Sequence, residues 1–123
     1  MKKIAVFLFE GAELFEIASF TDIFGWNNVV GLKEFRDIKV ETISYKESIK
    51  CTWGGKIKVE KVIIEENIGK FFDYDILVIP GGFGKANFFE GKNNEIFKKL
   101  IKYFSESNKI IVAICSAVIN LLE

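Results

Sequence analysis

The sequence predicts an α/β domain of three layers, in which helices cover both faces of a mostly parallel sheet. Continuous apolar runs of strand length occur at residues 3–9, 75–79 and 110–114, as in parallel strands buried on both faces. Helical spacing of apolar residues separates these runs at residues 13–26 and at residues 93–107, the second behind an Asn cap. The resulting order of strand, helix, strand, helix, strand is typical of this fold class.

Length and charge indicate one domain over residues 1–123 that binds a small molecule. Half of the 123 residues are hydrophobic and 28% are charged, which is the balance of a chain that folds. Seventeen basic and seventeen acidic residues cancel. No net field therefore draws the protein to nucleic acid or to an anionic membrane, and a small neutral or polar ligand is the expected partner.

The beginning of the chain imitates a signal peptide but is better explained as a first strand. Met1-Lys2-Lys3 precedes an apolar run, which Glu10 and Glu13 interrupt. No run reaches the eighteen or so apolar residues that span a bilayer, so we expect a cytoplasmic protein. The two cysteines are then free thiols. With no His in the chain, a Cys-His or Ser-His dyad and a typical zinc site are excluded, and we expect no cofactor and no metal.

Two weaker segments are expected at the border of the sheet. Residues 38–45 and 57–62 alternate apolar with charged side chains, as in edge strands exposed on one side. Gly54-Gly55 is a good two-residue turn, which predicts a small antiparallel hairpin inserted there. Residues 116–123 begin a helix without a stop signal, so the domain is expected to be incomplete at its C-terminus.

Cys115 follows the last apolar strand in the stretch Ala113-Ile114-Cys115-Ser116-Ala117. Small residues two before and two after a nucleophile allow a sharp strand-to-helix turn, and the helix start aims amides at the sulfur and favours the thiolate. The alternative is that Cys115 is a small buried hydrophobe, as free cysteines often are. Its position at a strand end favours a functional residue, because ligands of open α/β sheets bind beyond the carboxyl ends of the strands.

Glu16 and two glycines occupy the other strand ends. Glu16 lies in a helix that is apolar over most of its circumference, so its carboxyl is expected to be desolvated, protonated and able to donate a hydrogen bond to a thiolate. Glu13 is better explained as an acidic first turn that complements the helix dipole. Gly81 and Gly82 let the backbone approach a ligand and aim amides at an oxyanion, although taken alone they are better explained as a plain turn after a strand.

Other candidate features are assigned structural roles. Residues 82–87 lack the third glycine of a dinucleotide site, and Lys85 is not followed by Ser or Thr, which argues against nucleotide binding. Cys51 in the hairpin is interpreted as structural. Trp26, Trp53 and the many Phe residues are interpreted as core or interface.

Three stretches in order, KKIAVFLFEGAELFE, DYDILVIPGG and AICSAVINLL, resemble the ThiJ/PfpI superfamily, whose flavodoxin-like fold is shared with class I glutamine amidotransferases. The resemblance implies that Cys115 is the nucleophile, Glu16 the acid bonded to its sulfur, and the amides of Gly82 and Ser116 the oxyanion donors. It also implies a homodimer. Ala117-Val118 departs from the Gly or Pro usual there, and the last third of the family domain, with its His, is not part of this sequence.

The sequence leaves three functions open. The first is a cofactor-free cysteine enzyme of glyoxalase, deglycase, hydratase or amidohydrolase type, in which Cys115 forms a covalent adduct with a small carbonyl or amide compound. The second is a redox or oxidative-stress sensor, or a regulatory ligand-binding module, whose Cys115 is oxidised. The third is an inactive fragment. The lack of His, a common proton shuttle, counts against catalysis by this chain alone.

Overall fold

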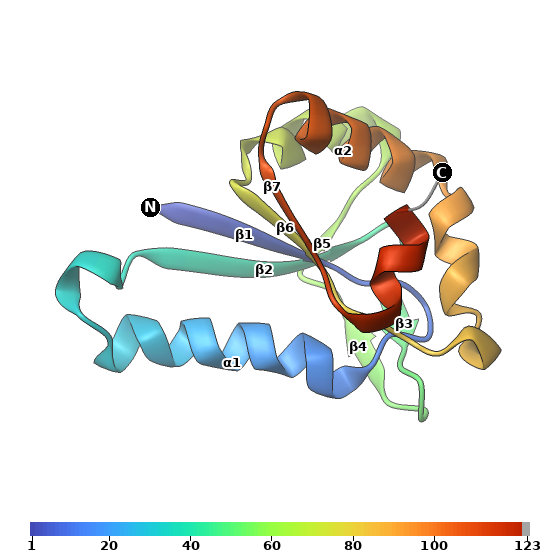
Figure 1. Cartoon of the computed structure of the whole chain (residues 1–123), viewed down its shortest axis with the longest axis horizontal. Coiled ribbons are helices and arrows are strands. Elements are labelled where there is room, and N and C mark those ends of the chain that lie inside the picture. Colours follow the sequence, from blue (N-terminus) through green and yellow to red (C-terminus); the bar gives the residue numbers. More distant parts are fainter. Residues whose placement is uncertain (122–123) are drawn as a thin grey trace.

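The computed structural model describes residues 1–121 and confirms the predicted α/β class (Figure 1). Its strands are β1 (Lys2–Phe7), β2 (Ile38–Ser44), β3 (Ser48–Lys50), β4 (Lys56–Lys58), β5 (Lys61–Val62), β6 (Ile76–Ile79) and β7 (Ile110–Ala113). Its α-helices are α1 (Leu14–Val30) and α2 (Glu95–Glu106), and its 3₁₀ helices are η1 (Lys33–Phe35), η2 (Glu65–Asp73), η3 (Gly84–Ala86), η4 (Phe88–Asn93) and η5 (Cys115–Leu121).

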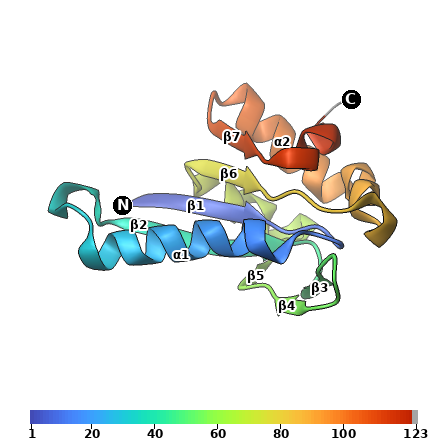
Figure 2. The ribbon, with the colours of Figure 1, turned by 60° about the horizontal axis from the view of Figure 1, so that its bottom comes forward.

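Five of the strands form one parallel sheet in the order β5-β2-β1-β6-β7. The helix α1 lies on one side of this sheet, and α2 lies on the other (Figure 2). The strands β3 and β4 form a separate antiparallel pair beside the carboxyl ends of the parallel strands. All five parallel strands therefore end at one edge, which is where ligands bind in this architecture.

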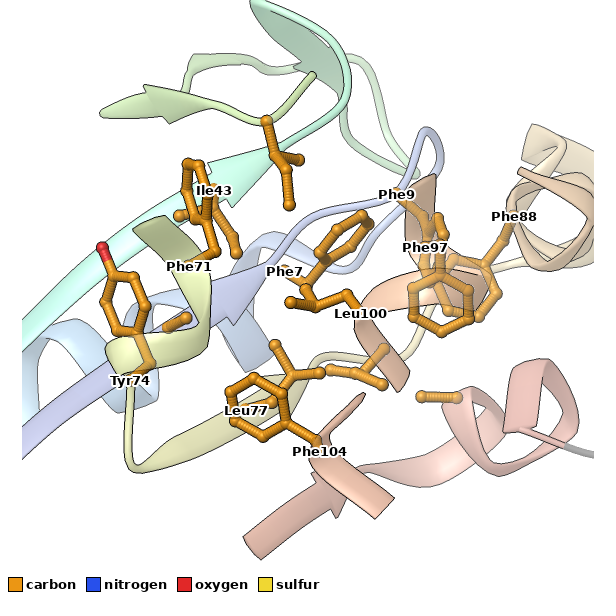
Figure 3. Close-up of a cluster of buried hydrophobic side chains, with 14 residues drawn as sticks. Phe7, Phe9, Ile43, Phe71, Tyr74, Leu77, Phe88, Phe97, Leu100 and Phe104 are labelled. Carbon is orange, nitrogen blue, oxygen red and sulfur yellow. The ribbon is translucent and has the colours of Figure 1, made fainter. Parts of the chain in front are cut away.

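The central strand β1 shows why the apolar runs fold this way. Residues 4–9 are at most 2% exposed, and alternate side chains enter two separate cores. Ile4, Val6 and Leu8 pack toward α1 and the β3–β4 pair. Ala5, Phe7 and Phe9 pack toward α2 (Figure 3). A strand buried on both faces needs apolar residues at every position, which confirms the interpretation of this run.

The predicted positions of the outer strands are partly wrong. The strand β2 is not at an edge, because it pairs with β1 and with β5. The segment 57–62 splits between β4 and β5, and of these two strands β5 alone belongs to the main sheet, at one edge. The strand β7 was expected to be buried on both faces, but β6 is its one neighbour in the described sheet, and Ile110 is 57% exposed.

The predicted hairpin exists, but its connection is longer than Gly54-Gly55. Lys50 pairs with Lys56, so residues 51–55 form the loop. The amide of Cys51 donates to the carbonyl of Gly55 at 2.7 Å, and the amide of Gly54 donates back to the carbonyl of Cys51 at 3.1 Å. These two hydrogen bonds close a five-residue loop, which is longer than the predicted two-residue turn.

The helix predictions are mostly confirmed. The side chain of Asn94 caps α2 by accepting a hydrogen bond from the amide of Phe97 at 3.0 Å, as expected for an Asn cap. The helix α1 reaches Val30 rather than residue 26. The last element is a 3₁₀ helix, Cys115–Leu121, and residues 122–123 of the helix predicted there lie outside the described residues.

The aromatic residues divide between the core and the surface. Six of the thirteen Phe residues are buried, and a chain of contacting rings connects four of them, Phe7, Phe9, Phe88 and Phe97. Trp26 is 64% exposed and Trp53 is 83% exposed, so a core role for these two residues is wrong. In the described part of the chain, no helix is both long and apolar enough to cross a membrane.

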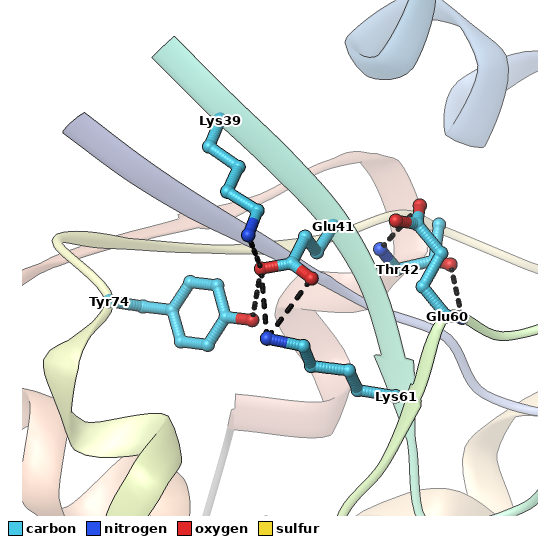
Figure 4. Close-up of polar contacts among 6 residues, drawn as sticks. All are labelled: Lys39, Glu41, Thr42, Glu60, Lys61 and Tyr74. Carbon is cyan, nitrogen blue, oxygen red and sulfur yellow. Dashed lines mark hydrogen bonds and ion pairs between the residues drawn. The ribbon is translucent and has the colours of Figure 1, made fainter. Parts of the chain in front are cut away.

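One carboxylate is buried at the outer part of the sheet. Glu41 on β2 is 5% exposed and accepts a hydrogen bond from the hydroxyl of Tyr74 at 2.9 Å (Figure 4). The ammonium of Lys61 lies 3.1 Å from it and that of Lys39 lies 3.5 Å from it. Burial acts to raise the pKa of Glu41, but the hydrogen bonds from Lys61 and Tyr74 and the two positive charges outweigh it and lower the pKa. The same burial, with the Glu41 carboxylate, raises the pKa of Tyr74.

The Glu41 cluster predicts a loss of stability in acid. A carboxyl whose pKa is lowered by folding stabilises the protein above its ordinary pKa near 4.5, and this contribution disappears as the pH falls through the lower folded value. We expect Glu41→Gln to reduce the free energy of unfolding by about 1–2 kcal/mol at pH 7 and to reduce its fall below pH ~4.5. Urea denaturation at pH 7 and at a pH below ~4.5 measures the free energy of unfolding of both proteins. Glu47→Gln is the control, because that side chain is 77% exposed, and an equal effect in both variants would contradict the account.

Candidate functional site

The three strand ends that carry the predicted site residues are adjacent. Because β6 lies between β1 and β7, the turn after it contacts both neighbours. The amide of Glu13 donates to the carbonyl of Gly81 at 2.8 Å, and Ala12 forms a β-bridge with Gly82. On the other side, the amide of Ile114 donates to the carbonyl of Ile79 at 3.1 Å. The backbone therefore holds the residues before Cys115, Gly81 and the start of α1 together.

Cys115 stands at the turn from β7 into η5. Its φ is +54°, in the left-handed region that residues other than glycine rarely adopt. Such a conformation costs on the order of 1–3 kcal/mol and persists only where surrounding contacts impose it. Here the amide of Ala117 donates to the carbonyl of Ile114 at 3.0 Å, and the side chain of Ala117 is fully buried beneath the turn. Cys115 itself is exposed, so the interpretation as a buried hydrophobe is wrong.

Glu16 reaches from the first turn of α1 to the same corner. Its Oε1 accepts a hydrogen bond from the amide of Gly81 at 2.8 Å, and the side chain is partly buried. A methyl group added to Gly81 would lie 2.8 Å from Glu16 Oε1 and 3.1 Å from Cys115 Cβ. Both predicted site side chains therefore border one small space, which stays open because residue 81 is glycine. Within residues 1–121 no hydrogen bond joins the sulfur to the carboxyl.

The side chain of Ser116 links the glycine turn to the cysteine turn. Its hydroxyl accepts a hydrogen bond from the amide of Gly82 at 3.1 Å and donates one to the carbonyl of Gly82 at 2.7 Å. The amides of Gly81 and Gly82 are thus engaged by Glu16 and Ser116. The amide of Ser116 donates no hydrogen bond among the described residues, so it is the free N–H of the three predicted donors.

The second cysteine has a different environment. Cys51 is 4% exposed and packs in the core beneath α1, which supports its structural role. Burial, followed by the negative charges of Glu10 and Glu13, raises the pKa of its thiol. A protonated buried thiol is a poor nucleophile. Of the two cysteines, Cys115 is the one exposed to solvent.

Two features near this site were missed in the sequence. The Ser116 hydroxyl was one, because only its amide was considered. The other is an exposed aromatic pair: Trp53 stacks on Phe83 with ring centroids 6.0 Å apart and an interplanar angle of 29°. Phe83 directly follows Gly82, so the pair forms an apolar wall beside the turn. The sequence signal that could have indicated this pair is the position of Phe83, close behind the end of β6.

Comparison with known proteins identifies the family. The sequence matches the DJ-1/PfpI family over residues 2–123. The chain belongs to the DJ-1/PfpI family. This confirms the resemblance carried by the three motifs. The chain is 33% identical over 103 residues to the uncharacterized protein MJ0967 of Methanocaldococcus jannaschii, a match that covers 71% of this chain and 47% of that protein.

Solved structures of DJ-1 proteins share the fold. Drosophila melanogaster DJ-1beta has a TM-score of 0.74 at 23% identity, with 98% of this chain and 58% of that chain covered. Oxidized Toxoplasma gondii DJ-1 has a TM-score of 0.71 at 21% identity, with 95% of this chain and 57% of that chain covered. This DJ-1/PfpI chain thus spans about half the length of its curated relative and under two thirds of these two structures.

Proposed function

We propose that this DJ-1/PfpI chain acts on small reactive carbonyl compounds, or on related amides, through Cys115 as nucleophile and without a cofactor. The observation that carries the proposal is the corner at Gly81, where an exposed cysteine at positive φ and a partly buried carboxyl border the same space. A cysteine held this way projects into solvent at the strand ends, where ligands of this architecture bind.

The geometry supports addition of the thiolate to a carbonyl group. A bond forms between Cys115 Sγ and the carbonyl carbon, the π electron pair moves to the oxygen, and that oxygen takes up a proton to give a hemithioacetal. The free amide of Ser116 is the group that stabilises the developing oxyanion, and the Glu16 carboxyl, which borders the same space, is the side chain placed to exchange a proton with the reacting group. The hydrogen bond from Gly81 holds the Glu16 carboxyl in place for either role.

Methylglyoxal turnover tests the enzymatic proposal. Cys115→Ala should reduce the rate of methylglyoxal loss by at least about 100-fold, because the covalent step depends on the sulfur. Cys51→Ala is the matched control and should retain the rate, since that thiol is buried. Equal rates in the wild-type protein and in Cys115→Ala would contradict the proposal.

A second function, redox sensing, is favoured by the exposure of Cys115. Exposed cysteines at the start of a helix are the ones that form sulfenic or sulfinic acid, and the Toxoplasma gondii relative was observed in an oxidized form. The same variants separate the two functions. Oxygen addition to Cys115 after mild peroxide, together with no turnover in the wild-type protein, would favour the sensor.

We further propose that the protein is a cytoplasmic homodimer. The supporting feature is an apolar exposed surface on α1, where Phe15 is 84%, Ile23 65%, Trp26 64% and Val30 70% exposed. Side chains of this size seldom gather on a surface without a partner. A second copy of the same helix would cover them around a two-fold axis.

A further inference from the structure

A second cavity opens at the carboxyl edge of the sheet, and its lining does not include Cys115 or Glu16. Its volume is about 520 Å³, which is within the range of small-molecule sites. The loops after β1, β2 and β3 and the region of η3 form its walls. We call it the lysine cleft, after its polar lining by Glu10, Lys46, Lys50, Thr52, Lys85 and Asn87.

The charges in the lysine cleft do not cancel. Three lysines and one glutamate line the cleft, and the carboxylate of that glutamate is already engaged on both oxygens. Oε2 of Glu10 is ion-paired with Lys46, and Oε1 accepts the amide of Lys50 at 2.6 Å. Among residues 1–121, neither Lys50 nor Lys85 forms an ion pair within 4 Å, although the charge of Lys50 helps to lower the pKa of Glu10. Two positive charges are therefore left over in a concave space.

The backbone of the lysine cleft is fixed rather than a set of free surface loops. The amide of Gly11 donates to the carbonyl of Lys50 at 2.8 Å, and the hydroxyl of Thr52 donates to the carbonyl of Gly11 at 2.7 Å. Gly11 has φ +80°, and a methyl group there would overlap the carbonyl oxygen of Ala86. Glycine at position 11 thus brings the η3 turn, with Lys85, against the loop that carries Lys50.

We propose that the lysine cleft binds a small molecule through a phosphate group, as a second site distinct from the Cys115 turn. Two uncompensated ammonium groups match the charge of a phosphate dianion, and lysines bind phosphate as point charges. The exposed side-chain amide of Asn87 supplies a further N–H donor at the rim. The volume exceeds that of inorganic phosphate alone, which leaves room for the rest of a small phosphorylated compound.

The proposal is tested by titrating the ¹⁵N-labelled protein with inorganic phosphate, glycerol 3-phosphate and, as neutral comparison, glycerol. We expect saturable amide shifts centred on Lys50, Thr52 and Asn87 with both phosphates and none with glycerol. If glycerol 3-phosphate binds more tightly than inorganic phosphate, the ligand of the cleft is a phosphorylated molecule. If the two affinities are equal, the ligand is the free phosphate ion. An absence of saturable shifts with either phosphate overturns the proposal.

Two double variants that remove the same charge distinguish binding in the lysine cleft from a general effect of net charge. Lys50→Gln with Lys85→Gln should weaken phosphate binding by about tenfold or more. Lys56→Gln with Lys58→Gln removes the same charge from the strand β4, outside the cleft lining, and should change binding by less than about twofold. Equal weakening in both pairs overturns the proposal. Cys115→Ala should bind phosphate like the wild-type protein, so this test is independent of the proposed enzymatic function.

Discussion

Iodoacetamide should alkylate Cys115 at least about 100-fold faster than Cys51 at neutral pH. Cys115 is exposed at the end of β7, whereas Cys51 is 4% exposed in the core under α1. Alkylation requires a thiolate that the reagent can reach. Burial both shields the Cys51 sulfur and raises the pKa of its thiol. Peptide mass spectrometry over a time course gives both rate constants from one sample.

The same reaction in concentrated urea supplies the control for this prediction. Unfolding removes the burial of Cys51 and the positive φ of Cys115, so the two rate constants should converge to within a few-fold. Comparable rates in the folded protein would show that the two thiols do not differ in the way that the structure describes.

Gly11→Ala should destabilise the protein by about 2–4 kcal/mol. An alanine at φ +80° costs on the order of 1–2 kcal/mol in backbone strain. Its methyl group would also overlap the carbonyl oxygen of Ala86, and overpacking of this kind typically costs about 1–3 kcal/mol. The backbone at this position has no freedom to shift, because Gly11 is hydrogen-bonded to Lys50, Thr52 and Phe83.

Gly55→Ala is the control for this substitution. A methyl group at Gly55 meets nothing within 4 Å, so we expect a change of less than about 0.5 kcal/mol. Urea denaturation of the two variants measures the difference. A Gly11→Ala protein as stable as the wild type would show that the η3 turn is not held against the loop after β1.

The central strands were predictable because their sequence pattern reports burial directly. From Ile4 in β1 to Phe9 just after it, every residue is apolar, and a strand with this pattern has to be covered on both faces. The position of β2 was not predictable in the same way. Glu41 looked like a residue facing solvent, yet Tyr74 and Lys61, distant in the sequence, supply the partners that allow its burial.

The candidate site shows the same division. Parallel topology alone places Cys115, the glycine pair and the start of α1 at one edge, so their adjacency follows from the order of elements. The hydrogen bond from Gly81 to Glu16 and the two hydrogen bonds of the Ser116 hydroxyl depend on the exact positions of these side chains in the folded protein. No local sequence pattern encodes them.

We propose that the carboxyl of Glu16 controls the reactivity of the Cys115 sulfur, because both side chains border the space at Gly81. The most direct measurement is the alkylation rate constant of Cys115 in Glu16→Met, with Glu13→Met as the matched control from the same turn of the chain. Methionine keeps the length of the side chain, but it donates no hydrogen bond and its sulfur is only a weak acceptor for the amide of Gly81. We expect Glu16→Met to slow alkylation of Cys115 by about tenfold and Glu13→Met to change it by less than about twofold. An unchanged rate in Glu16→Met, or an equal decrease in both variants, would contradict this account.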